Sequence, residues 1–399
     1  MTTLPPASVL SDPAALRGLW RFKPGVTYLN HGSFGACPTP VLEAAFEWAR
    51  RLAAEPCEFF QRHSPDLLAE VRARLGRFLG ASPADLVQMT NATVAGNVFA
   101  HAFPLRPGDE VLATDHEYGA MIRMWETLCR RAGARLVQAE LPWPVTTADA
   151  LVEALFAART ERTRLVLVSH VTSPTALVLP VAAIVARARA LGLPVMVDAA
   201  HAPGMFPVNL DALGAECTVG NCHKWMCAPV GSGFLHLTPA ARRMLGGPPP
   251  QVIGWGERPS RGREPGLWQA EFEWGGTRDY SAFLATATAI DLLEAIGWER
   301  IRFHAREVIA HARRRIPEVT GLAPAVPDDP DLCGAMVSLP LPAGDRAGLQ
   351  NALWHRFAIE VPVVEWKGRR LLRVSAHLYN TPDDVDRLAQ ALPAVLSTE

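Results

Sequence analysis

The middle of the chain alternates short apolar runs with longer stretches that have the spacing of amphipathic helices. Several of the short runs are apolar at consecutive positions, which is typical of strands covered on both faces. Strands that alternate with helices favour a mostly parallel sheet joined by right-handed crossovers. The strands expected are Asp85–Thr90, Glu110–Thr114, Arg135–Glu140, Leu165–His170, Val195–Ala199, Cys217–Gly220 and Gly233–Leu237. The helices expected between them are Thr93–Phe103, Tyr118–Ala132, Thr147–Ala158 and Val181–Leu191.

The remainder of the chain predicts a second, smaller unit. The stretch Leu245–Gly266 is dense in Gly, Pro and Arg and is expected to be irregular, and Ser281–Ile296 is expected to be a long helix that links two domains. The sequence therefore predicts an N-terminal segment (1–27), a large α/β domain with a mostly parallel seven-stranded sheet (28–280) and a smaller C-terminal α+β domain (281–399). The elements expected in the small domain are Ile301–Arg315, Ala335–Leu339, Ala347–Phe357, Leu371–Ser375 and Pro382–Leu396.

Composition narrows the class of protein. A chain of 399 residues is too long for one ordinary core, and 49% hydrophobic with 20% charged residues is the balance of a folded protein rather than a disordered one. A net charge of −1 gives no electrostatic reason to expect nucleic acid or an acidic membrane as a partner. No apolar run is long enough to span a bilayer, and the first residues do not read as a secretory signal, so the expected location is the cytoplasm.

The seven cysteines do not predict a disulfide framework, because the count is odd and they are spread along the chain. Cys217, Cys222 and Cys227 recur every five residues, whereas zinc sites usually space paired ligands two to four apart. We therefore expect buried, reduced thiols and no metal site.

Lys224 lies in the segment GNCHKW, directly after a predicted strand and between His223 and an aromatic residue. A lysine in apolar surroundings often has a lowered pKa and a nucleophilic amine. An exposed loop lysine is the alternative interpretation of this motif taken alone.

Asp198 ends a predicted strand 26 residues before Lys224, in LPVMVDAAHAPG. Ligands in open α/β sheets bind at the carboxyl ends of the strands. A carboxylate at this place can keep a pyridine nitrogen protonated, which makes the ring an electron sink. The alternative is a carboxylate that only caps the next helix.

A third motif, MTNATVAGN at Met89–Asn97, places Asn91, Ala92 and Thr93 between a strand and a helix. Free N–H groups at a helix start can bind phosphate, although a plain N-cap is also frequent. A phosphate turn, a strand-end aspartate and a following lysine, in this order, together predict pyridoxal 5′-phosphate (PLP) as the cofactor.

With these motifs in place, the chain resembles the fold-type I PLP enzymes of the class V aminotransferase group, and within it the isopenicillin N epimerase-like branch. The resemblance extends from about Tyr28 to Asp386. Its matching pieces are YLNHGSFG (28–35), TNAT (90–93), DHEY (115–118), VDAAHAPG (197–204), HKW (223–225), GGTRDYS (275–281) and LRVSAHLYNT (372–381).

The resemblance implies roles for residues around the cofactor. Lys224 would form the Schiff base and carry the proton at Cα, Asp198 would face the ring nitrogen, and His201 would lie beside the ring's phenolic oxygen. The residues expected at the phosphate are Asn91, Ala92, Thr93, Asn221 and His223, with Thr277 reaching over from a second subunit. The enzyme is therefore expected to be a homodimer with shared active sites.

The resemblance also implies the ring-facing and substrate-facing residues. His116 falls where the group places a residue stacked on the ring, and Tyr118 competes for that face. Ser173 would face the cofactor's O3′ or the substrate. Arg373 would hold the substrate's α-carboxylate by a bidentate pair. The alternative interpretation, a surface arginine beside the basic run Lys367–Arg370, is outweighed by the RVSAHLYNT match. The other residues expected on the substrate side are Asn30, His31 and Ser33, with Arg278 from the partner chain.

One departure disfavours a cysteine desulfurase. Desulfurases of this group carry a catalytic cysteine shortly before the substrate arginine, and the corresponding stretch here, IEVPVVEWKGRRLL at 359–372, has none. Cys333 lies well upstream and is better interpreted as a packed thiol.

The reaction itself stays open at this point. The first hypothesis is an amino-acid epimerase or racemase, with Lys224 serving one face of Cα and His116 or Tyr118 the other. The second is a C–S β-lyase that acts on a cysteine conjugate such as the ergothioneine precursor. A PLP-binding protein without turnover is disfavoured by the presence of Lys224, Asp198 and Arg373, and no residue pattern demands transamination.

Overall fold

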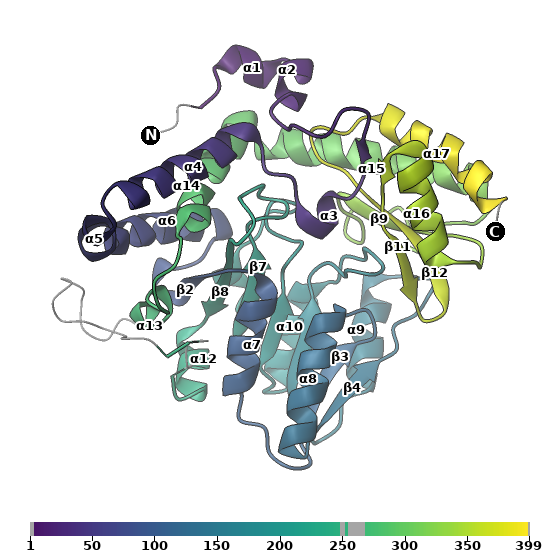
Figure 1. The fold of residues 1–399 in the computed structure, drawn as a ribbon. Helices are drawn as coiled ribbons and strands as arrows, with labels where there is room; N and C mark the ends of the chain where they lie inside the picture. Colours follow the sequence, from purple (N-terminus) through teal and green to yellow (C-terminus); the bar gives the residue numbers. More distant parts are fainter. Residues whose placement is uncertain (1–3, 248–251, 254–267, 398–399) are drawn as a thin grey trace.

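The computed structural model describes residues 4–247, 252–253 and 268–397, and a large sheet lies at its centre (Figure 1). Its seven strands follow the order β2-β8-β7-β6-β5-β3-β4. The strands from β7 to β4 pair in parallel, whereas β8 runs antiparallel to both of its neighbours. The predicted α/β class with a mostly parallel seven-stranded sheet is confirmed. The strands are β2 (Leu86–Met89), β3 (Glu110–Thr114), β4 (Arg135–Ala139), β5 (Thr163–Ser169), β6 (Val195–Asp198), β7 (Cys217–Asn221) and β8 (Gly233–Leu237).

Helices cover both faces of this sheet, which explains the consecutive apolar residues in its strands. Side chains alternate between the two faces of a strand. Val111 and Ala113 accordingly pack into one core with α7 and α8, whereas Leu112 between them packs into another with α9 and α10. The bounds of these helices are α7 (Ala92–Ala102), α8 (Gly119–Ala132), α9 (Ala148–Ala157) and α10 (Val181–Ala190).

The helix expected to join two domains, α14 (Ser281–Ile296), has the predicted bounds. It packs along α4 (Thr39–Ala54) and α6 (Ser64–Leu79), two helices that the sequence pattern did not single out. Its residues share a core with Leu86 and Phe234 of the large sheet. The domain boundaries stay a prediction.

The C-terminal part forms a second layer of strands and helices (Figure 1). A small antiparallel sheet has the order β11-β12-β9, and α15, α16 and α17 share its core. Its elements are β9 (Met336–Pro340), β11 (Val363–Trp366), β12 (Arg369–Ser375), α15 (Trp298–Thr320), α16 (Arg346–Phe357) and α17 (Pro382–Leu396). Near the start of the chain, β1 (Thr27–Tyr28) pairs in parallel with β10 (Ile359–Glu360), so the N-terminal segment is joined to this layer.

The remaining elements are short. They are α1 (Ala7–Ser11), α2 (Pro13–Arg17), α3 (His31–Phe34), α5 (Pro56–Glu58), η1 (Phe59–His63), η2 (Pro83–Asp85), α11 (Leu210–Leu213), α12 (Pro239–Met244) and α13 (Gln269–Glu273). The irregular stretch expected at Leu245–Gly266 falls largely outside the described residues. No single helix in the described ranges is long and apolar enough to cross a membrane; α14 and α15 pass that test only as a pair, with a bend of 78° between them.

Candidate active site

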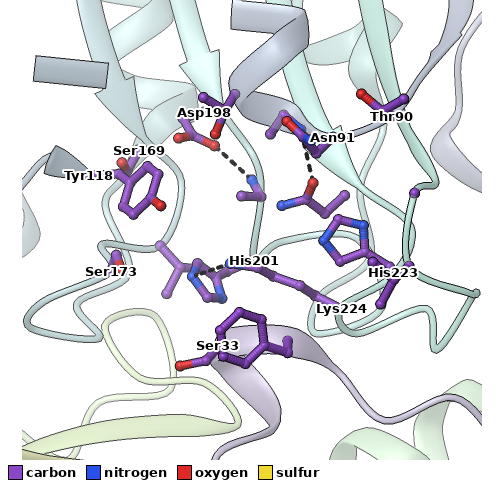
Figure 2. A pocket seen from close by; sticks show the side chains of 18 residues that line it. Ser33, Thr90, Asn91, Tyr118, Ser169, Ser173, Asp198, His201, His223 and Lys224 are labelled. Atoms are coloured by element: carbon purple, nitrogen blue, oxygen red, sulfur yellow. Dashed lines mark hydrogen bonds between the residues drawn. The ribbon is translucent and has the colours of Figure 1, made fainter. Parts of the chain in front are cut away.

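A pocket of about 290 Å³ opens where β5, β6 and β7 end and α7 begins (Figure 2). Ser169, Asp198 and Asn221 are the last residues of these three strands, and all of them line the pocket. Its position is the one that open α/β sheets use for ligands. The lining residues are Ser33, Phe34, Thr90, Asn91, Ala92, Thr93, Tyr118, Ser169, Val171, Ser173, Asp198, Ala200, His201, Asn221, His223, Lys224, Val230 and Gly231.

Lys224 lies in the loop after β7 and extends its amine into the pocket, as Figure 2 shows. Burial lowers the pKa of this amine to about 8, and the charge of Arg373 acts in the same direction while Asp198 opposes it. Roughly a tenth of the amine is therefore uncharged at pH 7, far more than for an ordinary lysine, and the uncharged form is the one that attacks a carbonyl carbon.

The tautomer of His201 determines which group donates the hydrogen bond between this histidine and the Lys224 amine. The Trp225 indole N–H donates to His201 Nδ1 at 3.2 Å, so in the neutral ring the proton is on Nε2. The pKa of His201 is well below its usual range because the ring is buried, with cationic Lys224 and Arg373 close by. His201 Nε2 lies 3.3 Å from Lys224 Nζ, and its N–H donates to the uncharged amine.

Asp198 is buried, with only 3% of the residue exposed. Burial raises the pKa of its carboxyl, while the N–H of Ala200, which donates at 2.9 Å, and the charge of Lys224 lower it. A cationic N–H partner would favour the ionised form of this carboxylate, and a protonated pyridine ring supplies such a partner.

The start of α7 forms the polar end of the pocket. Asn91 caps the helix by accepting from the Val94 N–H at 2.9 Å, and the Asn221 side chain accepts from the Ala92 N–H at the same distance. These two N–H groups are therefore already bonded, and Thr93 with the positive helix end remains for an anion. His223 Nδ1 donates to the Ser232 carbonyl at 2.9 Å, which leaves its Nε2 for the pocket.

Arg373 approaches the pocket from β12. Its Nη1 donates to the carbonyl and hydroxyl oxygens of Ser173 at 2.7 and 3.1 Å, and its Nη2 donates to the Ser33 hydroxyl at 2.6 Å. Its buried Nε has no hydrogen-bond partner among the described residues. Burial lowers the pKa of the guanidinium to about 10, so it stays charged at neutral pH. A carboxylate would satisfy this unpaired donor.

These groups fit PLP: an amine for the aldehyde, a strand-end carboxylate for the ring nitrogen and a helix start with a hydroxyl for the phosphate. A family model for class V aminotransferases matches residues 28–388. An isopenicillin N epimerase from Amycolatopsis lactamdurans is 42% identical over 92% of this chain and 95% of its own length. A putative L-cysteine desulfhydrase from rice (Oryza sativa subsp. japonica) is 31% identical over 97% of this chain and 86% of its own.

This chain belongs to the class V aminotransferase family. It is a PLP enzyme, and the predicted cofactor is confirmed. A cystine C–S lyase, solved in complex with its reaction product cysteine persulfide, matches the fold at a TM-score of 0.80 and 23% identity, over 92% of this chain and 97% of its own.

Tyr118 and His116 have different positions relative to the pocket. Tyr118 lines the pocket and is 44% exposed, whereas His116 is fully buried and does not line it. His116 Nδ1 is bonded to the Thr175 hydroxyl at 2.7 Å, and its ring packs 4.3 Å from the Trp366 ring. The indole of Trp366, in the β11–β12 hairpin, holds His116 behind the pocket wall, and the expected place of His116 over the cofactor ring stays a prediction.

Asn30 and His31 also lie behind the pocket rather than on its substrate side. His31 Nε2 contacts the Lys224 carbonyl at 3.1 Å and its Nδ1 contacts the Tyr379 hydroxyl at 2.8 Å, in a site without solvent exposure. Asn30 donates to Glu360 at 3.1 Å. In α3, Ser33 and Phe34 line the pocket, whereas His31 contacts the backbone of the lysine loop, and the substrate-side role expected for Asn30 and His31 stays a prediction.

Thr277 and Arg278 do not line this pocket. Thr277 is exposed, and Arg278 packs its guanidinium over the Tyr280 and Phe283 rings, beside a smaller cavity near Val252. Their expected contribution to the site of a partner subunit stays a prediction.

The sequence motifs did not single out Glu117. Its carboxylate accepts from the hydroxyls of Thr114 and Ser169, each at 2.6 Å, and burial raises its pKa to about 7 with Asp198 contributing in the same direction. Ser169 lines the pocket and is paired with Asp198 in the sheet. Glu117 lies inside the DHEY motif, but in the sequence an acidic residue there is typical of an ordinary helix start. Only the three-dimensional contacts show that it is bonded to a residue of the pocket.

Proposed function

We propose that this enzyme is an amino-acid epimerase similar to isopenicillin N epimerase. The observation that carries the proposal is the 42% identity to such an epimerase over nearly the whole chain. When bound, PLP withdraws electrons from the α-carbon of the attached amino acid, which weakens the bonds at that carbon. The side chains of the pocket then decide which bond breaks and where the proton returns.

Lys224 is proposed to remove and return the α-proton on one face. Its pKa of about 8 makes the amine a competent base near neutral pH, and the 3.3 Å contact with His201 Nε2 positions the side chain. Asp198 would face the ring nitrogen, and Thr93 with the start of α7 would hold the phosphate. Arg373, fixed by Ser33 and Ser173, would hold the α-carboxylate and so orient the α-carbon toward the amine.

Tyr118 is proposed to serve the opposite face. Tyr118 lines the pocket with a phenol hydroxyl that can donate a proton. It lies just before α8, whereas Lys224 lies in the loop after β7 (Figure 2). Burial lowers the pKa of Arg373, and an electrostatic interaction with Tyr118 opposes this shift, so the two groups are near enough to act on one substrate. Inversion removes the α-proton on one face of the α-carbon and returns a proton on the other, which a lysine and a tyrosine on separate walls can do.

The pocket is proposed to be completed by a second copy of the chain. Phe34 and Val230 line it and yet are 69% and 75% exposed in the single chain. Two such exposed apolar side chains at the mouth of one pocket support a surface that another chain covers. Thr277 of that copy would then add its hydroxyl at the phosphate.

A C–S β-lyase is the second candidate, supported by the 31% identity to a putative L-cysteine desulfhydrase. Both reactions begin with loss of the α-proton, so the residues assigned above would serve either one. A persulfide-forming desulfurase is not proposed, because in the described structure none of the seven cysteines lines the pocket.

Incubation in heavy water separates the two candidates. An epimerase places deuterium at the α-carbon of both enantiomers of its substrate and releases neither pyruvate nor ammonia, as NMR and chiral chromatography would reveal. Tyr118→Phe should then abolish inversion while exchange with retention continues through Lys224. If pyruvate and ammonia form stoichiometrically from a cysteine conjugate and no amino acid is inverted, the epimerase proposal is wrong and the C–S β-lyase takes its place.

A further inference from the structure

Three potential metal ligands meet at a point remote from the pocket. Asp85 ends η2 before β2, Asp211 lies in α11, and His236 lies on β8. One ligand atom from each falls within 4.8 Å of the others. Within β8, His236 is three residues from Gly233, which pairs with Asn221 at the pocket, so the cluster lies about 10 Å along the strand from the active site.

His236 is unusual because its ring is fully buried and neither nitrogen has a hydrogen-bond partner among the described residues. Buried polar groups in native proteins nearly always have a partner. Its Nε2 lies 3.4 Å from Asp211 Oδ1, which exceeds the usual N–H···O distance of about 2.7–3.2 Å. The hydroxyl of Thr218, paired with His236 across the sheet, also has no partner in the described structure.

Both carboxylates of the cluster are oriented by outer partners. Arg242 Nη1 donates to Asp85 Oδ1 at 2.7 Å, and the Ser82 N–H donates to Asp211 Oδ2 at 2.9 Å. Each carboxylate thereby keeps its other oxygen available. Hydrogen bonds of this kind orient ligating carboxylates in known metal sites. Arg242 offsets one of the two negative charges, which leaves a net charge that attracts a cation.

We propose that Asp85, Asp211 and His236 bind a divalent transition ion of the zinc type, with water as the fourth ligand. Tetrahedral zinc with ligands at about 2.0–2.2 Å sets neighbouring ligand atoms about 3.3 Å apart, which is close to the 3.4 Å between His236 and Asp211. Asp211 is 51% exposed, which gives the ion a route from solvent.

The ion would have a structural role, because it would join η2, α11 and β8 without touching the pocket. A second group of possible ligands, His31, Cys227 and His377, is less suitable. The two imidazoles there are stacked at 4.4 Å and nearly parallel, so their in-plane lone pairs do not converge, and His31 Nε2 contacts the Lys224 carbonyl.

The test is a zinc titration of PLP-saturated enzyme from which metal has been removed by a chelator. Wild type should bind one zinc ion per chain more than Asp211→Asn or His236→Gln, and its Tm should rise with excess zinc. Affinity at this site should fall at least about tenfold in either variant. His101→Gln, at an exposed histidine in α7, is the matched control and should bind like wild type.

Equal zinc uptake and equal affinity in wild type and Asp211→Asn would overturn the proposal, as would a wild type that binds no zinc. Asp211 is at the surface, and asparagine keeps an oxygen for the Ser82 N–H, so this variant tests the site even if His236→Gln does not fold. Cobalt(II) absorption bands that are present in wild type and lost in Asp211→Asn would support tetrahedral binding by these ligands.

Discussion

At the scale of single residues, the environment of Lys224 determines its reactivity. The lysine loop is held from behind by His31 and from the side by His201, and burial leaves an amine with a pKa of about 8. The sequence predicted the amine and its carboxylate partner, because strand ends and small residues mark them. It placed His31 on the substrate side and did not choose between His116 and Tyr118, since the side of a turn that faces a pocket depends on packing between distant elements.

The pKa of Lys224 can be measured in the apoenzyme. Because burial lowers it to about 8, the uncharged amine should appear as the pH rises from 7 to 9, far below the usual range for lysine. The rate of acylation at Lys224, followed by peptide mass spectrometry, should increase through this interval and then level off. Lys367 is the internal control: its pKa is raised by Asp115 and Glu140, so its labelling should stay low. A Lys224 midpoint near 10 would contradict the buried amine.

At the scale of elements, the alternation of strands and helices was sufficient to locate all seven strands of the large sheet to within two residues. Apolar runs covered on both faces produce a pattern that survives in the sequence. The paired strands β1 and β10 have two residues each, which is too short for any periodicity, and they were not predicted. The short helix α3 was not predicted as a helix, and its residues were noted only as part of the YLNHGSFG motif. It nevertheless contacts the lysine loop, and Ser33 within it is bonded to Arg373.

A substitution at Gly35, which follows α3, tests the contact between α3 and the lysine loop. Its φ is +60°, and a Cβ there would lie 2.1 Å from the His223 carbonyl oxygen and 2.7 Å from Lys224 Cα. We expect Gly35→Ala to lower the free energy of unfolding by about 2–4 kcal/mol and to weaken PLP binding. Gly25→Ala is the control, since Gly25 also has a positive φ but nothing within 4 Å, and it should cost only about 1 kcal/mol. Urea unfolding and cofactor absorbance would measure both; equal losses in the two variants would contradict the contact.

At the scale of the whole molecule, the single chain leaves the mouth of the pocket open beside Phe34 and Val230. The sequence predicted a homodimer from the GGTRDYS motif, and Thr277 in that motif is exposed and outside the pocket of its own chain. No composition or periodicity signal reports such an arrangement, because it depends on the surface of a second copy.

Mixing two inactive variants tests the shared site. Lys224→Ala lacks the amine, and Thr277→Ala would lack the hydroxyl offered to the neighbour. A heterodimer of the two contains one intact site if Thr277 serves the partner, so random mixing should restore about a quarter of the wild-type sites. PLP binding and activity of the mixture report the result, and light scattering gives the mass. An active monomer, or a mixture no better than its components, would overturn the shared site.

The hydrogen bonds that hold Arg373 have a consequence for the order in which the site forms during synthesis of the chain. Its guanidinium is bonded to Ser33 and Ser173, which lie 340 and 200 residues earlier in the chain. The residues proposed to hold the cofactor, from Asn91 to Lys224, leave the ribosome well before Arg373 is synthesised. A growing chain can therefore expose a reactive amine long before it can recognise an amino-acid substrate, and the selectivity of the finished enzyme is the last part of it to be built.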